Sequence, residues 1–76
     1  MPHVVVKMFP GPTEAQKASL ADAIVRSLVE TVGSREKSIS VAIEEVQPQD
    51  WMTQVYASEI GPHLDQLYKK PGYGPT

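Results

Sequence analysis

The fold is decided by residues 4–46, which read VVVKMFPGPTEAQKASLADAIVRSLVETVGSREKSISVAIEEV. The first six of these residues, Val4 to Phe9, are rich in valine and predict a β-strand. Residues 38–46 alternate between apolar and polar side chains and predict a second strand. The residues between the two strands carry the pattern of a helix. A strand, a long helix and a strand in this order predict a βαβ unit, whose strands run parallel with a right-handed crossover.

The predicted helix runs from Thr13 to Val32 and has clear signals at both ends. Thr13 and Gln16 have the spacing of a capping box, and Pro10-Gly11-Pro12 ends the strand before them. Gly33 stands where a helix favours glycine after its last turn. Apolar side chains recur at helical spacing and form one stripe: Leu20, Ala21, Ile24, Val25, Leu28 and Val32.

The rest of the chain predicts a second, C-terminal helix from Trp51 to Lys70, after a turn at Pro48-Gln49-Asp50. Its apolar stripe consists of Ile60, Leu64, Leu67 and Tyr68. Gly61-Pro62 lies inside the helix and is expected to kink it or to divide it in two, because proline cannot donate the helical hydrogen bond. The predicted fold class for residues 1–76 is therefore a single α/β domain, a βαβ protomer with an added C-terminal helix.

Composition excludes several classes of function. The chain has 76 residues and no cysteine, which excludes disulfides, thiolate metal sites and a cysteine nucleophile. Seven basic and nine acidic residues give a formal net charge of −2, so we expect no nucleic-acid partner. No apolar run approaches the roughly 20 residues of a membrane span, and the first residues do not resemble a signal peptide. We therefore expect a cytoplasmic protein that a second copy of the chain stabilises.

Pro2 is the one unusual candidate for catalysis. An initiator methionine is normally removed before a small residue, and its removal would give Pro2 a free secondary amine. An amide nitrogen is not a base because its lone pair is delocalised, whereas this amine can take up and release a proton. Apolar surroundings would lower the pKa of the amine by disfavouring the cation. On residue type alone, however, a structural role at the start of a strand is the commoner one.

The other polar residues form no familiar catalytic arrangement. Glu44 and Glu45 are adjacent on a predicted strand, so their side chains point to opposite faces and do not make a carboxylate pair. His3 could touch a site, although a surface or structural histidine is more common, and His63 is expected to be exposed. The two histidines are too far apart in the chain to suggest a metal site.

A series of short segments after Pro2 resembles a known family. The segments are Pro2-His3-Val4-Val5-Val6, the turn at Gly11, Gln16-Lys17 with Leu20, and the strand from Ser38 to Ile43. In this order and spacing they resemble the 4-oxalocrotonate tautomerase group of the tautomerase superfamily. The later segments, Glu59-Ile60-Gly61-Pro62 and Lys69-Lys70-Pro71-Gly72-Tyr73, are similar to those of the longer, dimeric bacterial members associated with phenylpyruvate tautomerisation.

This resemblance implies a homodimer in which two βαβ protomers form a four-stranded sheet with helices on one face. It implies an isomerase, a keto–enol tautomerase, that needs no cofactor or metal and acts on a small 2-keto acid such as phenylpyruvate. Pro2 would be the general base and acid. Trp51, in the loop after the second strand, would line the pocket and shield the amine from water.

Two positions depart from the family pattern. The best-known members carry two arginines that hold a dicarboxylate, and this chain has Pro12 and Ser40 there. Because neither residue can form a bidentate carboxylate clamp, we expect a monocarboxylate substrate with an apolar tail. Backbone N–H groups near Ile39 and Ser40, or the side chain of Lys37, would meet its carboxylate. The developing oxyanion would be met by backbone N–H groups, the Trp51 indole or Ser40.

Other functions remain open on sequence alone. A non-catalytic dimeric module could keep the same fold without the arginines. Alternatively, Pro2 could serve in the addition of water to an activated acid, or in enamine formation with a carbonyl compound.

Overall fold

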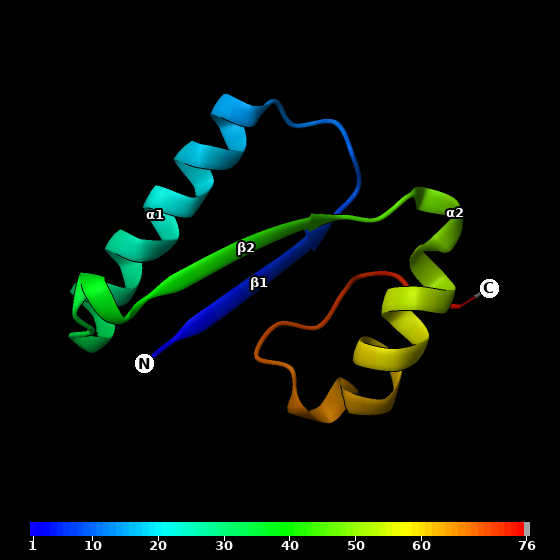
Figure 1. Ribbon diagram of the computed structural model, residues 1–76. Helices are drawn as coiled ribbons and strands as arrows, with labels where there is room; N and C mark the ends of the chain where they lie inside the picture. Colours follow the sequence, from blue (N-terminus) through cyan, green and yellow to red (C-terminus); the bar gives the residue numbers. More distant parts are fainter. Residues whose placement is uncertain (76) are drawn as a thin grey trace. The chain divides into compact units, whose positions relative to one another are not determined.

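The computed structural model describes residues 1–75 and divides them into two compact units (Figure 1). The first unit comprises Met1–Glu45, and the second begins at Val46. The first unit contains two strands and a long helix, and the second contains the C-terminal helices.

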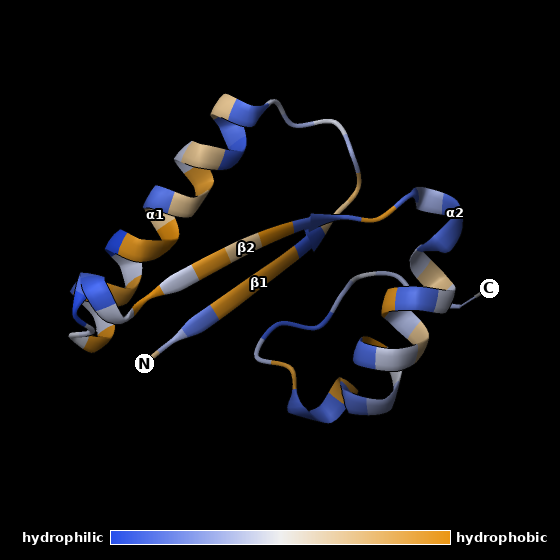
Figure 2. Cartoon of the chain, viewed as in Figure 1, coloured by the Kyte–Doolittle hydropathy of each residue, from blue (hydrophilic) through white to orange (hydrophobic). Residues whose placement is uncertain are grey.

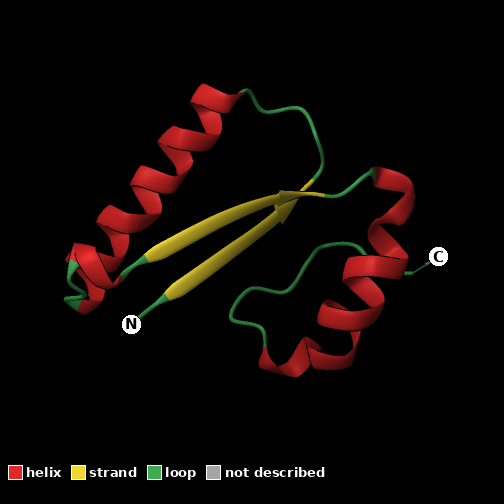
Figure 3. Ribbon diagram, in the orientation of Figure 1, coloured by secondary structure: helices red, strands yellow, loops and turns green. Residues whose placement is uncertain are grey.

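The first unit is a βαβ unit. Its elements are strand β1 (His3–Met8), helix α1 (Glu14–Val32), the short 3-10 helix η1 (Glu36–Ser38) and strand β2 (Ser40–Glu45) (Figure 3). The two strands are parallel, and His3 pairs with Ser40 at one end of the ladder while Met8 pairs with Glu45 at the other. The predicted βαβ arrangement with a second helical segment after it is therefore confirmed.

Helix α1 covers one face of this two-stranded sheet. Side chains alternate along a strand, so Val6, its partner Ile43 and, two residues on, Glu45 share a face. Lys17 of α1 lies 3.2 Å from Glu45, which identifies this face as the one beneath the helix. Figure 2 shows the largely apolar strands alongside α1.

The opposite face of the sheet is mixed in character. His3 and Ser40 lie at one end of it, and Val5 follows on β1. Val5 leaves 44% of its surface exposed in the single chain. A strand so rich in valine favours a sheet that is covered on both faces. A cover for the face turned away from α1 therefore remains a prediction.

Both ends of α1 carry the predicted caps. The backbone N–H of Gln16 donates to Oγ1 of Thr13 (3.1 Å), and the N–H of Thr13 donates to Oε1 of Gln16 (2.8 Å). Gly33 ends the helix in the left-handed region at φ 72°, and its N–H donates to the carbonyl of Val29 (3.1 Å). The predicted helix boundaries are confirmed.

The strand boundaries differ slightly from the predicted ones. β1 begins and ends one residue earlier than the predicted span, which is within the usual uncertainty of element ends. β2 is shorter than residues 38–46 because Ser38 belongs to η1. The N–H and the hydroxyl of Ser38 both donate to the carbonyl of Arg35, at 2.9 and 2.8 Å. These local bonds compete with strand pairing.

The second unit contains three consecutive helical segments, α2 (Pro48–Trp51), the π-helix η2 (Met52–Ile60) and the 3-10 helix η3 (Gly61–Gln66). The helical region begins at Pro48 and not at Trp51, because proline is favoured in the first turn, where its missing N–H costs no bond. The segment expected as a turn is thus the first turn of α2. The predicted division at Gly61 is confirmed.

The core of the second unit is formed by Val55 and Tyr56, which are 5% and 8% exposed. Gly61 allows close packing here, because a Cβ at this position would lie 3.1 Å from Cε1 of Tyr56. The ring of Tyr73 lies 5.8 Å from that of Tyr56, so the C-terminal segment folds back on η2.

The prediction that the C-terminal helix and its apolar stripe extend to Tyr68 and Lys70 is wrong. The helical region ends at Gln66, so Leu67 and Tyr68 lie beyond it, and Tyr68 is fully exposed. Ile60 and Leu64 are half-buried, as the stripe requires. Across residues 1–75, no helix is both long enough and apolar enough to cross a membrane.

Candidate functional site

Pro2 is held at the end of the sheet, directly before β1. Its carbonyl oxygen accepts a hydrogen bond of 3.2 Å from the backbone N–H of Ser40. This bond belongs to the first pair of the parallel ladder, that of His3 with Ser40, and Pro2 is half-buried. Met1 is fully exposed, so the residue whose removal would free the Pro2 nitrogen is accessible.

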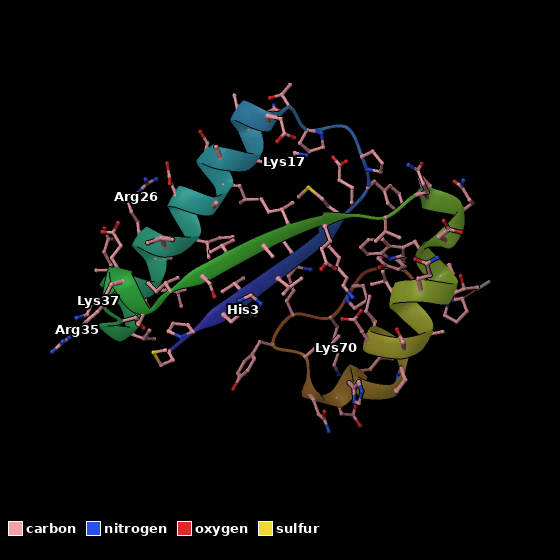
Figure 4. The ribbon with its side chains drawn as sticks, in the orientation of Figure 1. His3, Lys17, Arg26, Arg35, Lys37 and Lys70 are labelled. Atoms are coloured by element: carbon pink, nitrogen blue, oxygen red, sulfur yellow. The ribbon has the colours of Figure 1, made fainter. Side chains whose placement is uncertain are left out.

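A second contact joins the same two strand ends. Nδ1 of His3 lies 2.6 Å from Oγ of Ser40, on the sheet face turned away from α1 (Figure 4). Either atom can be the donor, because a hydroxyl both donates and accepts and the imidazole role depends on its tautomer. Both residues are exposed. An imidazole and a hydroxyl therefore stand at the surface next to Pro2, whereas residue type alone favours a surface or structural role for His3.

The backbone N–H groups of Ile39 and Ser40, expected to hold a carboxylate, already have acceptors. That of Ile39 donates to the carbonyl of Glu36 (3.1 Å), and that of Ser40 donates to the carbonyl of Pro2 (3.2 Å). The expectation that they serve as anion donors is therefore wrong for this conformation. Ile39 contributes a half-buried apolar side chain between η1 and β2.

Lys37 is an exposed residue of η1. Figure 4 shows its side chain beside that of Arg35, at the turn and pointing away from His3. The structure thus brings together Pro2, His3 and Ser40, and leaves Lys37 outside this group.

Trp51 belongs to the second unit and is the last residue of α2, so the expectation of a loop position is wrong. Its indole Nε1–H donates to the hydroxyl of Tyr73 at 2.7 Å. An indole has one N–H, so this donor is already used and does not serve as a spare oxyanion donor. Its half-buried ring keeps the apolar surface expected of a pocket wall.

Lys17 forms ion pairs with two glutamates of the first unit. Its Nζ lies 2.5 Å from Glu14 and 3.2 Å from Glu45 (Figure 4). The hydrogen bonds that Lys17 donates, to Glu14 first and to Glu45 second, raise its pKa above the ordinary value of 10.5. Because Glu45 pairs at the end of the ladder opposite to Ser40, this cluster has a structural role remote from Pro2.

Other groupings in the described part of the chain lack the features of a site. Residues 1–75 contain no cluster of three or more His, Cys, Asp or Glu side chains able to hold a metal ion. A surface pocket in the second unit is lined by consecutive residues, Gly61 to Gln66, and includes none of the predicted site residues. His63, on its rim, is exposed as expected.

Comparison with known proteins finds relatives along nearly the whole chain. The family model described as "Tautomerase enzyme" matches residues 2–58. The chain is 47% identical over 74 residues to Tautomerase PptA of Cronobacter sakazakii, which covers 96% of this chain and 97% of that protein. It is 40% identical over 74 residues to a probable tautomerase of Xylella fastidiosa, which covers 97% and 90%.

Solved structures show the same relationship. YwhB, a homologue of 4-oxalocrotonate tautomerase, has 41% identity and a TM-score of 0.59 over 60% of this chain and 75% of its own. TomN, a 4-oxalocrotonate tautomerase homologue of the tomaymycin biosynthetic pathway, has 26% identity and a TM-score of 0.64 over 70% and 82%. DmpI from Helicobacter pylori has 33% identity and a TM-score of 0.59 over 60% and 78%.

Proposed function

Because this chain belongs to the tautomerase family and is an isomerase of that kind, we propose that it interconverts the enol and keto forms of a small 2-keto acid such as phenylpyruvate. The proton carrier in this proposal is Pro2, as the amino-terminal residue after removal of Met1. The reaction uses no metal and no organic cofactor.

The proposed reaction is a pair of proton transfers. The free Pro2 amine takes the proton of the enol hydroxyl, and the resulting prolinium delivers a proton to the neighbouring carbon as the carbonyl forms. One proton leaves oxygen and one is added to carbon, so the amine is restored at the end. A positioned acid and base of this kind contributes about 10²–10⁴-fold to a rate.

The observation that carries this proposal is the hydrogen bond from the Ser40 N–H to the carbonyl of Pro2. A catalytic amine is effective only when it is held at a defined place relative to the reacting atoms. This bond holds Pro2 through its carbonyl oxygen. It therefore leaves the nitrogen of the processed chain free to exchange a proton.

The proposed substrate class follows from the two positions at which the family carries carboxylate-binding arginines and this chain does not. Pro12 and Ser40 cannot clamp a second carboxylate, so a monocarboxylate is favoured over a dicarboxylate. We assign the hydroxyl of Ser40 and the apolar side chain of Ile39 to contacts with the substrate, and Trp51 to the apolar wall for its tail. The chain as a whole would be one domain of a cytoplasmic homodimer with a four-stranded sheet, and the unpaired edges of the two-stranded sheet support a second copy.

The test compares the ketonisation of enol-phenylpyruvate by the processed protein, by Pro2→Ala and by Pro10→Ala. Intact mass spectrometry first establishes that Met1 is absent from all three. We expect Pro2→Ala to lose about 10²–10⁴-fold in kcat/KM, and the control at the exposed Pro10 to keep the parent rate. Equal rates for all three proteins would remove Pro2 from the mechanism. Borohydride trapping with an aldehyde would reveal enamine formation instead.

A further inference from the structure

Ser40 is bonded to two successive residues at the start of the chain. Its backbone N–H donates to the carbonyl of Pro2 (3.2 Å), and its Oγ lies 2.6 Å from Nδ1 of His3. The imidazole is therefore fixed one residue away from the proposed catalytic nitrogen. The strand pairing that places His3 opposite Ser40 makes this arrangement part of the sheet.

The pair can offer two donors to a ligand when Nδ1 of His3 carries the hydrogen of their shared bond. When Nδ1–H of His3 donates to Oγ of Ser40, the hydroxyl hydrogen is free to donate elsewhere. In the doubly protonated imidazole, Nε2–H is a second free donor and the ring carries a positive charge. Two such donors suit the two oxygens of a carboxylate, and bonds to charged groups are the stronger ones. Both residues are exposed in the single chain and lie at the very end of the sheet, beside Pro2.

The other donors considered for a carboxylate are placed less well. The N–H groups of Ile39 and Ser40 are used within the chain. The side chain of Lys37 points away from His3 at the η1 turn. Of the donors considered among the described residues, the His3 ring and the Ser40 hydroxyl therefore remain, and both lie at the Pro2 end of the sheet.

From this geometry we infer that His3 and Ser40 together bind the carboxylate of the substrate. His3 is then a specificity-determining residue, which selects carboxylic acids over their neutral analogues. The inference rests on the proposed function of Pro2 and adds to it the group that recognises the substrate.

A binding experiment tests the inference without any turnover. The processed protein, labelled with 15N, is titrated with cinnamate, an aryl carboxylate, and with cinnamamide, its neutral counterpart. We expect a saturable shift of the His3 ring resonances with cinnamate, at least tenfold weaker binding of cinnamamide, and no shift of the His63 ring. A His3 ring that ignores cinnamate, or that responds equally to the amide, overturns the inference.

A kinetic experiment then separates binding from chemistry. We expect His3→Phe and Ser40→Ala each to raise the KM for enol-phenylpyruvate about tenfold while kcat changes less than about threefold, because the lost contact binds substrate and transition state alike. His3→Asn, which keeps a polar atom near the place of Nδ1, should recover part of the loss. His63→Phe is the matched control and should leave KM unchanged.

The two experiments distinguish failure of this inference from failure of the proposed function. If Pro2→Ala abolishes activity while the His3 and His63 variants behave alike, only the carboxylate assignment is wrong. If the parent protein does not accelerate ketonisation, the proposed substrate fails, and the cinnamate titration still decides whether His3 and Ser40 bind a carboxylate.

Discussion

The indole N–H of Trp51 donates a hydrogen bond of 2.7 Å to the hydroxyl of Tyr73. The ring of Tyr73 also lies 5.8 Å from that of Tyr56, at an angle of 49°. Tyr56 is part of the buried core of the second unit. Tyr73 therefore joins the last residue of α2 to the C-terminal segment and fixes the orientation of the indole.

We predict that Tyr73→Phe destabilises the second unit and releases the indole N–H. The change keeps the aromatic ring against Tyr56 and removes the acceptor for Trp51. The loss of one hydrogen bond should lower the free energy of unfolding by about 1 kcal/mol, measured by urea denaturation. In the NMR spectrum, the Nε1–H resonance of Trp51 should shift, and its exchange with water should become faster.

Tyr68→Phe is the matched control, since it removes the same hydroxyl from a fully exposed residue. We expect a change in unfolding free energy within about 0.5 kcal/mol and an unchanged indole resonance. If Tyr73→Phe behaved like Tyr68→Phe in both measurements, the bond between Trp51 and Tyr73 would not exist in solution.

The N-terminal cap of α1 supplies a second prediction. Thr13→Ala removes the hydroxyl that accepts from the N–H of Gln16 at 3.1 Å and breaks the capping box. We expect a loss of about 1 kcal/mol in unfolding free energy, within the range of about 0.5–2 kcal/mol for such caps. Thr31→Ala makes the same change inside the helix, on its exposed side, and should be neutral or slightly stabilising because alanine favours helices.

The comparison requires equal protein concentrations, since pairing of chains would affect stability. Equal effects at Thr13 and Thr31 would show that the cap does not contribute.

The parts of the fold that could be predicted are those determined by interactions between residues close together in the sequence. Thr13 and Gln16 bond to each other three residues apart, and Gly33 acts on the last turn of the helix it ends. Gly61 and Pro62 divide the C-terminal helices by the same kind of short-range effect. Each of these signals works within one helical turn, so the linear sequence contains it.

The contacts of the candidate site are not local. His3 and Ser40 are 37 residues apart, and their contact depends on the parallel register of β1 and β2. A shift of one residue in that register would move either side chain to the other face, and a short alternating pattern does not fix it in advance. Trp51 and Tyr73 are 22 residues apart, and nothing local marks them as partners. The π-helical form of Met52–Ile60 has no sequence signal that we can identify.

The ion pairs of Lys17 make the stability of the fold depend on pH. Its ammonium bonds to Glu14 within α1 and to Glu45 at the end of β2, and these bonds raise its pKa above 10.5. A group whose pKa is higher in the folded state stabilises the fold while it is protonated. This contribution is complete below pH 10.5, the value in the unfolded chain, and is lost as the pH rises through the higher folded-state value.

We therefore predict that the destabilisation caused by Lys17→Met is constant from neutral pH to about pH 10 and becomes smaller above the ordinary lysine pKa of 10.5. Urea denaturation of the parent and the variant at a series of pH values measures this difference. Lys37→Met, at an exposed residue of η1, is the control and should show a small effect without this pH dependence. Glu45→Gln separates the two partners, because it removes the ion pair between α1 and β2 and leaves the ion pair with Glu14 within the helix. A destabilisation by Lys17→Met that persisted undiminished in strong alkali would mean that Lys17 acts through the packing of its methylene groups, since the charge would by then be gone.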